Sequence, residues 1–143
     1  MANSIIMKDN GGALVTAKEE KATAAITPGD LVEFVSTGGI RRHATIGGAA
    51  RAAFAVENSV IGKGIDDDYA ANDAVKYVVA APGVELYALL ATGKSCSKGD
   101  FLESFGNGKL QVASTPIEGS NVAVALEAIT GGGSPKRVKV EVV

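Results

Sequence analysis

The sequence contains one histidine and one cysteine, the two side chains needed for a thiol–imidazole catalytic pair. His43 and Cys96 lie far apart in the chain, and neither stands in a recognisable nucleophile motif. Cys96 also takes the place of Ile26 in an internal repeat described below, which favours a core role. A zinc site needs three or four ligands of the His/Cys type. We therefore expect neither a catalytic residue nor a structural zinc site, and no enzyme.

A second motif, Gly93-Lys94-Ser95, matches the end of a phosphate-binding loop, in which backbone amides and a lysine hold phosphates. The position five residues before Gly93 holds Ala88 instead of the glycine that such a loop requires. A Gly-Asp turn and a strand pattern follow where the loop should open a helix. The sequence therefore predicts no nucleotide binding and no cofactor.

An acidic run, Asp66-Asp67-Asp68 with Asp73, offers oxygen atoms of the kind that Ca²⁺ prefers. Its spacing fails the EF-hand pattern, because Ala70 stands at the third ligand position and Ala71 at the position of the sharp-turn glycine. The other reading is a solvated acidic loop beside Lys63. The sequence leaves open whether an ion binds there.

Arg41 and Arg42, with Arg51 nearby, form a small basic cluster of opposite sign to the acidic run. One interpretation is an ordinary charged strand face. The other is a contact used in assembly, since complementary charges steer docking and fix its register.

Composition excludes several classes of protein. The chain has 143 residues, 14 Lys and Arg against 16 Asp and Glu, and therefore no basic excess of the kind that nucleic-acid-binding proteins carry. No apolar run approaches the ~20 residues of a membrane-spanning helix, and the N-terminus lacks a signal-peptide pattern. A single cysteine excludes an intrachain disulfide. We expect synthesis in the cytoplasm, and neither a nucleic-acid nor a membrane partner.

The elements that must position these residues repeat once along the chain. A turn over residues 26–30, a strand over 31–35, a glycine turn over 37–39 and a strand over 40–45 return seventy positions later. Gly supplies a positive φ and Asp binds neighbouring amides, so a Gly-Asp pair opens each strand in the same way. The two units fit two related hairpins in one barrel or sandwich. The matching positions are Gly29 and Gly99, Asp30 and Asp100, Glu33 and Glu103, and Gly38 and Gly108.

Further strands are predicted over residues 75–80, 84–91, 122–129 and 137–143. The last of these alternates valine with charged residues, which indicates one packed and one solvated face. With only 5% aromatic residues, Val, Ile, Leu and Ala must fill the interior. The predicted fold class is all-β: a small β-barrel or tulip-like sandwich built from short hairpins, with an extended N-terminal arm.

The first 25 residues carry a weaker pattern, in which Ile5-Ile6-Met7 form a short apolar run. One reading is a loosely held terminus, and the other is an arm that orders on a partner. We predict an arm over residues 1–25 and a single β domain over 26–143.

A resemblance to a known family covers residues 26–143. The chain resembles the head decoration, or cement, proteins of tailed double-stranded DNA bacteriophages, through a pattern of turns and strands. The segments that carry it are residues 54–58, 62–70, 75–77, 82–83, 87–91, 98–100, 102–104, 106–110, 124–128 and 137–140.

That resemblance implies a structural virion protein on the outer surface of the expanded capsid, which cements adjacent capsomers against internal DNA pressure. The implied partners are the major capsid protein and further copies of the chain itself, most commonly as a homotrimer. The residues predicted to contact the capsid through the arm are Ile5, Ile6, Met7 and Lys8, with Arg41, Arg42 and Arg51 as possible assembly contacts.

The alternative function is a free-standing β-barrel module that binds a receptor or a carbohydrate. Sugar-binding sites commonly use exposed aromatic platforms, and this chain has no tryptophan. The tyrosines that remain for such a platform are Tyr69, Tyr77 and Tyr87.

Overall fold

The computed structural model describes residues 4–8 and 15–143, and the regular secondary structure of this part of the chain is almost entirely β, as predicted. One turn of 3-10 helix, η1, interrupts the strands. The elements are β1 (Ile6–Lys8), β2 (Val15–Lys21), β3 (Val32–Phe34), β4 (Ile40–Arg42), β5 (Ala53–Ala55), η1 (Ser59–Ile61), β6 (Ala74–Ala80), β7 (Glu85–Leu90), β8 (Phe101–Gly106), β9 (Lys109–Val112), β10 (Asn121–Ala125) and β11 (Lys136–Val142).

Strands β7 to β11 form a closed barrel, which confirms the predicted β-barrel. Their order is β7-β11-β10-β8-β9, and a parallel pairing of Leu90 with Leu110 joins β9 back to β7. In β11, Val138, Val140 and Val142 point inward while Glu141 is exposed, so the predicted alternation of this strand is confirmed.

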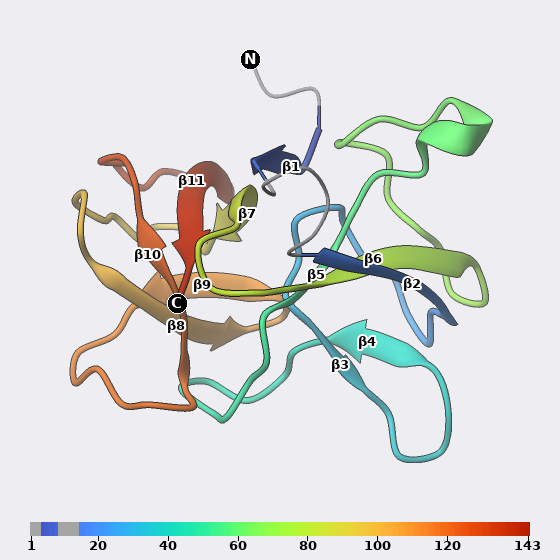
Figure 1. Cartoon of the computed structure of the whole chain (residues 1–143), viewed down its shortest axis with the longest axis horizontal. Coiled ribbons are helices and arrows are strands. Elements are labelled where there is room, and N and C mark those ends of the chain that lie inside the picture. Colours follow the sequence, from blue (N-terminus) through green and yellow to red (C-terminus); the bar gives the residue numbers. More distant parts are fainter. Residues whose placement is uncertain (1–3, 9–14) are drawn as a thin grey trace.

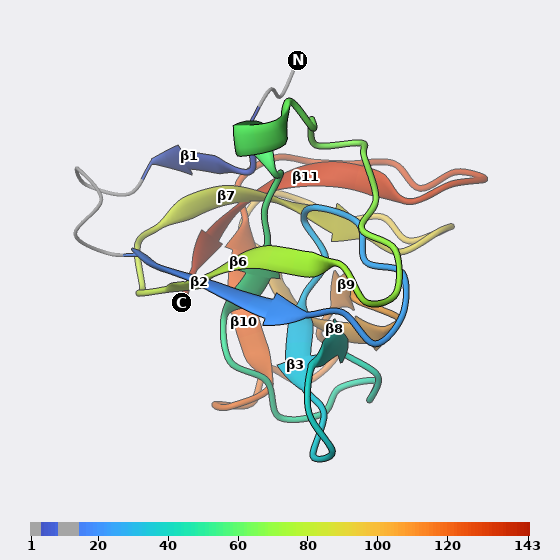
Figure 2. The ribbon, with the colours of Figure 1, turned by 90° about the vertical axis from the view of Figure 1, so that its right-hand side faces the viewer.

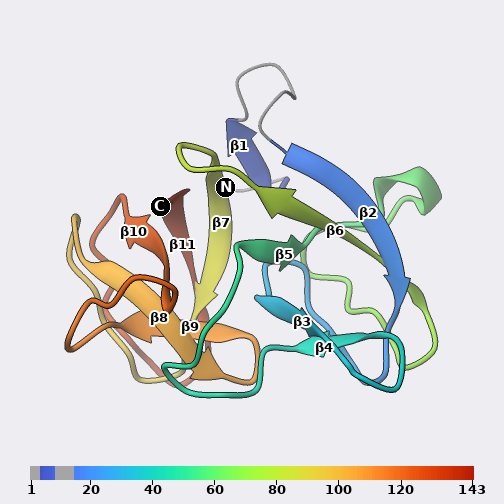
Figure 3. The same ribbon diagram turned by 60° about the horizontal axis from the view of Figure 1, so that its bottom comes forward.

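Strands β2 to β6 follow the same order as the barrel strands. A sheet β2-β6-β5 and the hairpin β3-β4 are joined by two isolated bridges. Leu31 bridges to Phe54 beside β3 and β5, and Ala22 bridges in parallel to Ile40 of β4. The chain therefore contains two barrel-like copies, which Figure 1 and Figure 3 show side by side, β2 to β6 on the right and β7 to β11 on the left.

The registers of the two copies match residue for residue. The β3–β4 pair Val32↔Arg42 has its counterpart seventy positions on, in the β8–β9 pair Leu102↔Val112. The β5–β6 pair Ala55↔Tyr77 likewise corresponds to Ala125↔Val140 of β10 and β11. The predicted repeat of two hairpins is therefore confirmed, and it extends to all five strands. Matching register makes β2 the equivalent of β7, with Lys18↔Tyr77 corresponding to Leu86↔Val140.

Each copy has its own core, and the second core continues into the first copy. The core of the first copy gathers Ile26, Val32, Ile40, Val75 and Tyr77 among others. The larger core lies inside the second barrel and also includes Leu31 and Phe54 of the first copy. The two copies are therefore packed together through apolar side chains, as one body.

The described N-terminal segments pair with the body. β1 lies beside β7, as Figure 2 shows, with Ile6 paired to Leu86, and β2 pairs with β6 along its full length. Ile5 is fully buried in the larger core, and its amide donates to Glu57 Oε2 at 3.1 Å. β2 is thus a strand of the first copy, and β1 is added to the second barrel beside β7, so the backbone groups of both described segments pair with strands far along the sequence. The side chains of Met7 and Lys8 lie outside the described part of the structure.

None of the helical segments that the structure describes is long and apolar enough to cross a membrane.

Candidate functional site

The two Gly-Asp turns have the same local geometry. In the first, the Thr27 amide donates to Asp30 Oδ2 at 2.8 Å and the Asp30 amide donates to Thr27 O at 2.9 Å. In the second, Ser97 and Asp100 make the same two contacts at 2.8 and 3.1 Å. The glycine between them has φ 98° at Gly29 and 95° at Gly99, a conformation that favours glycine.

In the described chain, only the first of these turns packs against the other copy. A Cβ added to Gly29 would lie 2.7 Å from Arg137 Nη1 and 3.2 Å from the carbonyl oxygen of Tyr87, both in the second copy. A Cβ added to Gly99 would meet no heavy atom of the described chain within 4 Å outside residues 98–100. The first turn is therefore the point at which the first copy docks onto the second.

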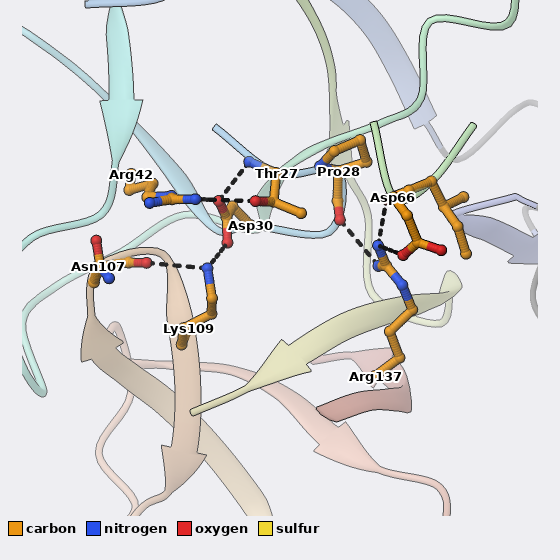
Figure 4. Close-up of polar contacts among 9 residues, drawn as sticks. Thr27, Pro28, Asp30, Arg42, Asp66, Asn107, Lys109 and Arg137 are labelled. Carbon is orange, nitrogen blue, oxygen red and sulfur yellow. Dashed lines mark hydrogen bonds and ion pairs between the residues drawn. The ribbon is translucent and has the colours of Figure 1, made fainter. Parts of the chain in front are cut away.

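A buried ion network fixes this docking. Asp30 is fully buried, and it accepts from Arg42 Nε at 2.7 Å and from Lys109 Nζ at 2.5 Å, as Figure 4 shows. Arg42 also donates to Thr27 Oγ1 at 2.9 Å, and Lys109 to Asn107 O at 3.4 Å. Two cations around one buried carboxylate keep its oxygens hydrogen-bonded, which a buried charge requires. Because Lys109 belongs to β9, the network joins the two copies.

Arg137 of β11 makes a second polar link between distant segments. Its guanidinium donates to Pro28 O at 2.9 Å, to Ile65 O, and to Asp66 Oδ1 at 3.3 Å. Figure 4 shows Arg137 reaching from the second barrel toward both the first turn and the acidic loop. This side chain therefore ties the loop before β6 to the junction of the two copies.

His43, Ser104 and Glu33 lie in an order that resembles a hydrolase triad. Ser104 Oγ is 2.8 Å from His43 Nδ1, and Glu33 Oε2 is 3.6 Å from His43 Nε2. Ser104 is fully buried and His43 is 3% exposed, so no substrate can reach the hydroxyl. Ser104 Oγ also accepts from the Gly106 amide, and His43 Nε2 lies 3.0 Å from Ala49 O. The group is a closed hydrogen-bond network that supports the turn after β8.

The predicted core role of Cys96 is confirmed. Its side chain is buried in the larger core, and its thiol donates to Glu127 O at 3.6 Å. Burial raises the pKa of the thiol, with a smaller contribution from the nearby Asp100 and Glu127 carboxylates and an opposing one from the Ile129 backbone. A raised pKa keeps the sulfur protonated, which is the opposite of an activated nucleophile.

The basic cluster predicted from the sequence divides into different roles. Arg42 belongs to the buried network, so its guanidinium is already bound within the chain. Arg41 pairs with Glu33 at 2.9 Å on the surface, and the Arg51 guanidinium lies 4.3 Å from the Phe34 ring centroid. Arg41 and Arg51 are thus the two members that remain at the surface as predicted assembly contacts.

The acidic loop and the glycine–lysine motif both use their polar groups internally. Asp67 accepts from the Gly64 amide at 2.7 Å, and Asp73 from the Ala70 amide at 2.8 Å. Among the described residues, no three His, Cys, Asp or Glu side chains are grouped so that they could hold a metal ion. In the turn after β7, the Gly93 amide donates to Gly132 O of the loop before β11, and the Lys94 amide donates to Ala91 O. No helix begins at this turn.

Sequence reasoning did not identify Asp30, Lys109 and Arg137 as the residues that join the copies. The repeat singled out Asp30 as a turn residue, but it assigned the same role to Asp100. Burial distinguishes the two aspartates, and this burial depends on residues of β9 and β11 far along the chain.

Comparisons with known proteins locate the fold. No family model and no curated protein matches this sequence. Among solved structures, the chain is similar to the head fiber gp8.5 N base of bacteriophage phi29, with a TM-score of 0.59. The match covers 91% of this chain and 95% of that one at 12% sequence identity, so the two share a fold over nearly their whole lengths.

Proposed function

We propose that this chain is a structural protein of a bacteriophage virion that binds the outer surface of the expanded capsid and cements adjacent capsomers. The observation that carries the proposal is the likeness of both copies together to a phage head fiber base, over 91% of the chain. The family resemblance stated from the sequence supports the same class of protein independently of that likeness.

The structure of the junction agrees with a mechanical role. The buried Asp30 network and the shared core hold the two copies as one body, which is suited to bridging sites on a shell. The two arrangements that resemble catalytic groups, at His43 and at Cys96, are buried and hydrogen-bonded. Nothing in the proposed mechanism makes or breaks a covalent bond.

The proposed mechanism is thermodynamic linkage. A protein that binds the assembled shell and not its free subunits stabilises the assembled state by the free energy of that binding. Several weak contacts engaged through one homo-oligomer, proposed to be a trimer, give avidity without a single tight site. The partners are then the major capsid protein and further copies of this chain, at the outer face of the virion.

The proposed capsid contacts are revised by the burial of their members. Ile5 packs inside the core, so among the four N-terminal candidates the contact is proposed for Ile6, Met7 and Lys8. To these we add Val60 and Ile61 of η1 as proposed contacts, because they are 80% and 66% exposed. An exposed apolar pair at the tip of a loop is a typical contact surface for another protein.

Sedimentation of the purified protein with expanded, undecorated capsids tests the proposal. We expect saturable co-sedimentation with the shells and a higher temperature of capsid disruption once they are saturated. Capsids that have not expanded serve as the matched control. Failure to bind expanded shells, together with saturable binding in a glycan panel, would replace the proposal with the free-standing binding module.

Two sets of variants separate the candidate surfaces. Arg41→Gln with Arg51→Gln should slow attachment and flatten its dependence on salt, because exposed charges act mainly on the association rate. Val60→Ser with Ile61→Ser should weaken attachment without changing its salt dependence. Lys136→Gln, at the exposed first residue of β11, is the control for the charge changes.

A further inference from the structure

The two copies expose equivalent surfaces to different degrees. Leu31 and Phe54 lie on the outer face of the first copy and are fully buried, because the second barrel packs against them. Matching register places Phe101 and Val124 at the same positions of the second barrel. Phe101 is 41% exposed and Val124 is partly exposed. The face that joins the copies within the chain is therefore open on the second barrel.

The turn beside this open face is also free. Pro28, Gly29 and Asp30 of the first turn are buried at the junction, whereas the equivalent Lys98 and Gly99 are exposed. The second barrel thus presents the equivalent element, a Gly-Asp turn with an apolar residue after it, at its surface, with Asp100 partly exposed.

The first copy presents the surface that would receive such a turn. At the intrachain junction, the turn of the first copy docks onto the second barrel beside a hollow of about 410 Å³. Leu89, Asn107, Lys109 and Pro135 of the second barrel line part of this hollow. The register equivalents of these four residues are Lys21, Thr37, Gly39 and Asn72. All four line an open hollow of about 420 Å³ on the first copy.

At the intrachain junction the first turn lies directly against Gly108, whereas no such turn lies against the equivalent Gly38. A Cβ on Gly108 would lie 2.8 Å from Asp30 Cγ, since the first turn sits directly against it. A Cβ added at the equivalent Gly38 would meet no heavy atom within 4 Å in the described chain outside residues 37–39. One end of the molecule therefore carries an undocked turn, and the other an unfilled receiving surface.

We propose that a second copy of this chain fills this surface, docking its turn over residues 97–101 into the hollow around Lys21, Gly38 and Gly39. The contact repeats between chains the arrangement that joins the two copies within one chain. This contact rests on the proposed function in one respect: it supplies the contact surfaces of the homo-oligomer proposed there.

The chemistry of this contact differs from the intrachain junction at its charged positions. Gly39, Ala74 and Val112 stand at the register positions of Lys109, Arg137 and Arg42, so none of the three cations of the intrachain junction has an equivalent there. Lys21, exposed at the rim of the hollow, supplies a cation of the right sign for Asp100. Phe101 and Val124 supply the apolar centre, as Leu31 and Phe54 do inside the chain.

A contact between two different surfaces of the same chain is heterologous. Each subunit keeps one free turn and one free hollow after docking, so association continues until a ring closes or a filament grows. A three-membered ring satisfies every turn and every hollow, in agreement with the proposed trimer.

Complementary variants test the contact, with sedimentation velocity and native mass spectrometry as the readouts and no capsid in the sample. Phe101→Glu disables the turn face and Lys21→Glu disables the hollow. Each should weaken self-association at least about tenfold, since each places a like charge or an unpaired charge in the contact. The matched controls are Ile46→Glu, at an apolar residue 63% exposed elsewhere, and Lys63→Glu, at another exposed lysine.

Mixing the two variants provides the decisive result. The Phe101→Glu protein keeps its hollow and the Lys21→Glu protein keeps its turn, so an equimolar mixture should give a dimer with one subunit of each. Val124→Glu should behave as Phe101→Glu does, and an unchanged far-ultraviolet circular dichroism spectrum will verify that each variant folds. A monomeric wild-type protein, single variants that associate normally, or a mixture that fails to dimerise would each overturn the proposal. Binding to capsids by a protein that stays monomeric would leave the proposed function standing and remove this contact alone.

Discussion

Lys109 Nζ lies 2.5 Å from Asp30 Oδ1, although 79 positions separate the two residues in the sequence. The carboxylate belongs to a turn of the first copy and the ammonium group to a strand of the second. Asp30 is fully buried, and the Lys109 side chain is only 10% exposed. The relative placement of the two copies therefore depends on a charge pair that neither copy could satisfy alone.

The equivalent aspartates Asp30 and Asp100 form a matched pair for mutation. Asp30→Ala leaves Lys109 and Arg42 without their shared carboxylate in a buried site, and breaking such a pair costs about 3–5 kcal/mol of unfolding free energy. Asp100→Ala removes one hydrogen bond to the Ser97 amide from an exposed turn, a loss of about 1 kcal/mol. Urea unfolding followed by circular dichroism measures both values. Equal losses at the two positions would show that the network contributes nothing beyond the turn.

The shared core predicts that the two copies unfold together. Phe54→Ala removes a fully buried side chain at the junction and should cost about 3–5 kcal/mol. Val124→Ala, at the equivalent and partly exposed position, should cost less than about 1.5 kcal/mol. A single calorimetric transition is expected for the wild-type protein and for both variants, because Leu31 and Phe54 belong to the second barrel's core. Two separate transitions would contradict the shared core.

The sequence predicted the two hairpins because their turns depend on local chemistry. Gly29 and Gly99 need a positive φ, and Asp30 and Asp100 bind an amide three residues back, so both features recur in the sequence itself. The strand pairings that close each copy have no such signature in the sequence. Leu90 pairs with Leu110, and Ala22 with Ile40, through backbone bridges that any apolar residue can form.

The candidate site was harder to predict than the fold. Asp30 and Asp100 are indistinguishable in sequence, and only the docking of one copy on the other buries the first of them. The same holds for Ile5, because an apolar residue at this position is compatible with a contact arm as well as with the core in which the structure buries it. In both cases the deciding contact involves residues more than fifty positions away.

The raised pKa of the Tyr69 phenol predicts a loss of stability at alkaline pH. Burial raises the pKa of its phenol, the nearby Glu57, Glu19 and Asp73 carboxylates add to this effect, and the Lys76 backbone opposes it. The hydroxyl donates to Val56 O at 2.7 Å. In the unfolded chain the phenol loses its proton near pH 10, whereas the folded protein retains it to higher pH. The unfolded state then binds fewer protons, so the free energy of unfolding falls as the pH rises above about 10.

Tyr69→Phe measures this contribution. The variant should be less stable at neutral pH, by about 1 kcal/mol for the lost hydrogen bond, and its stability should fall less steeply between pH 9.5 and 11. Tyr87→Phe, on the outer face of the second barrel, is the control. Parallel pH profiles for the wild-type protein and Tyr69→Phe would show that another group causes the alkaline loss.

Ile5 separates a structural role of the N-terminal segment from a role in capsid attachment. Its side chain is fully buried, so Ile5→Ala should lower the free energy of unfolding by about 2–5 kcal/mol. Deleting residues 1–12 should therefore lower the melting temperature as well as weaken attachment, because the deletion removes both the buried Ile5 and the pairing of β1 with β7. Ile6→Ser, at a partly exposed residue, is the comparison that leaves Ile5 in place. If the deletion weakens attachment while the melting temperature stays unchanged, the packing of Ile5 contributes nothing measurable and the segment acts as an independent arm.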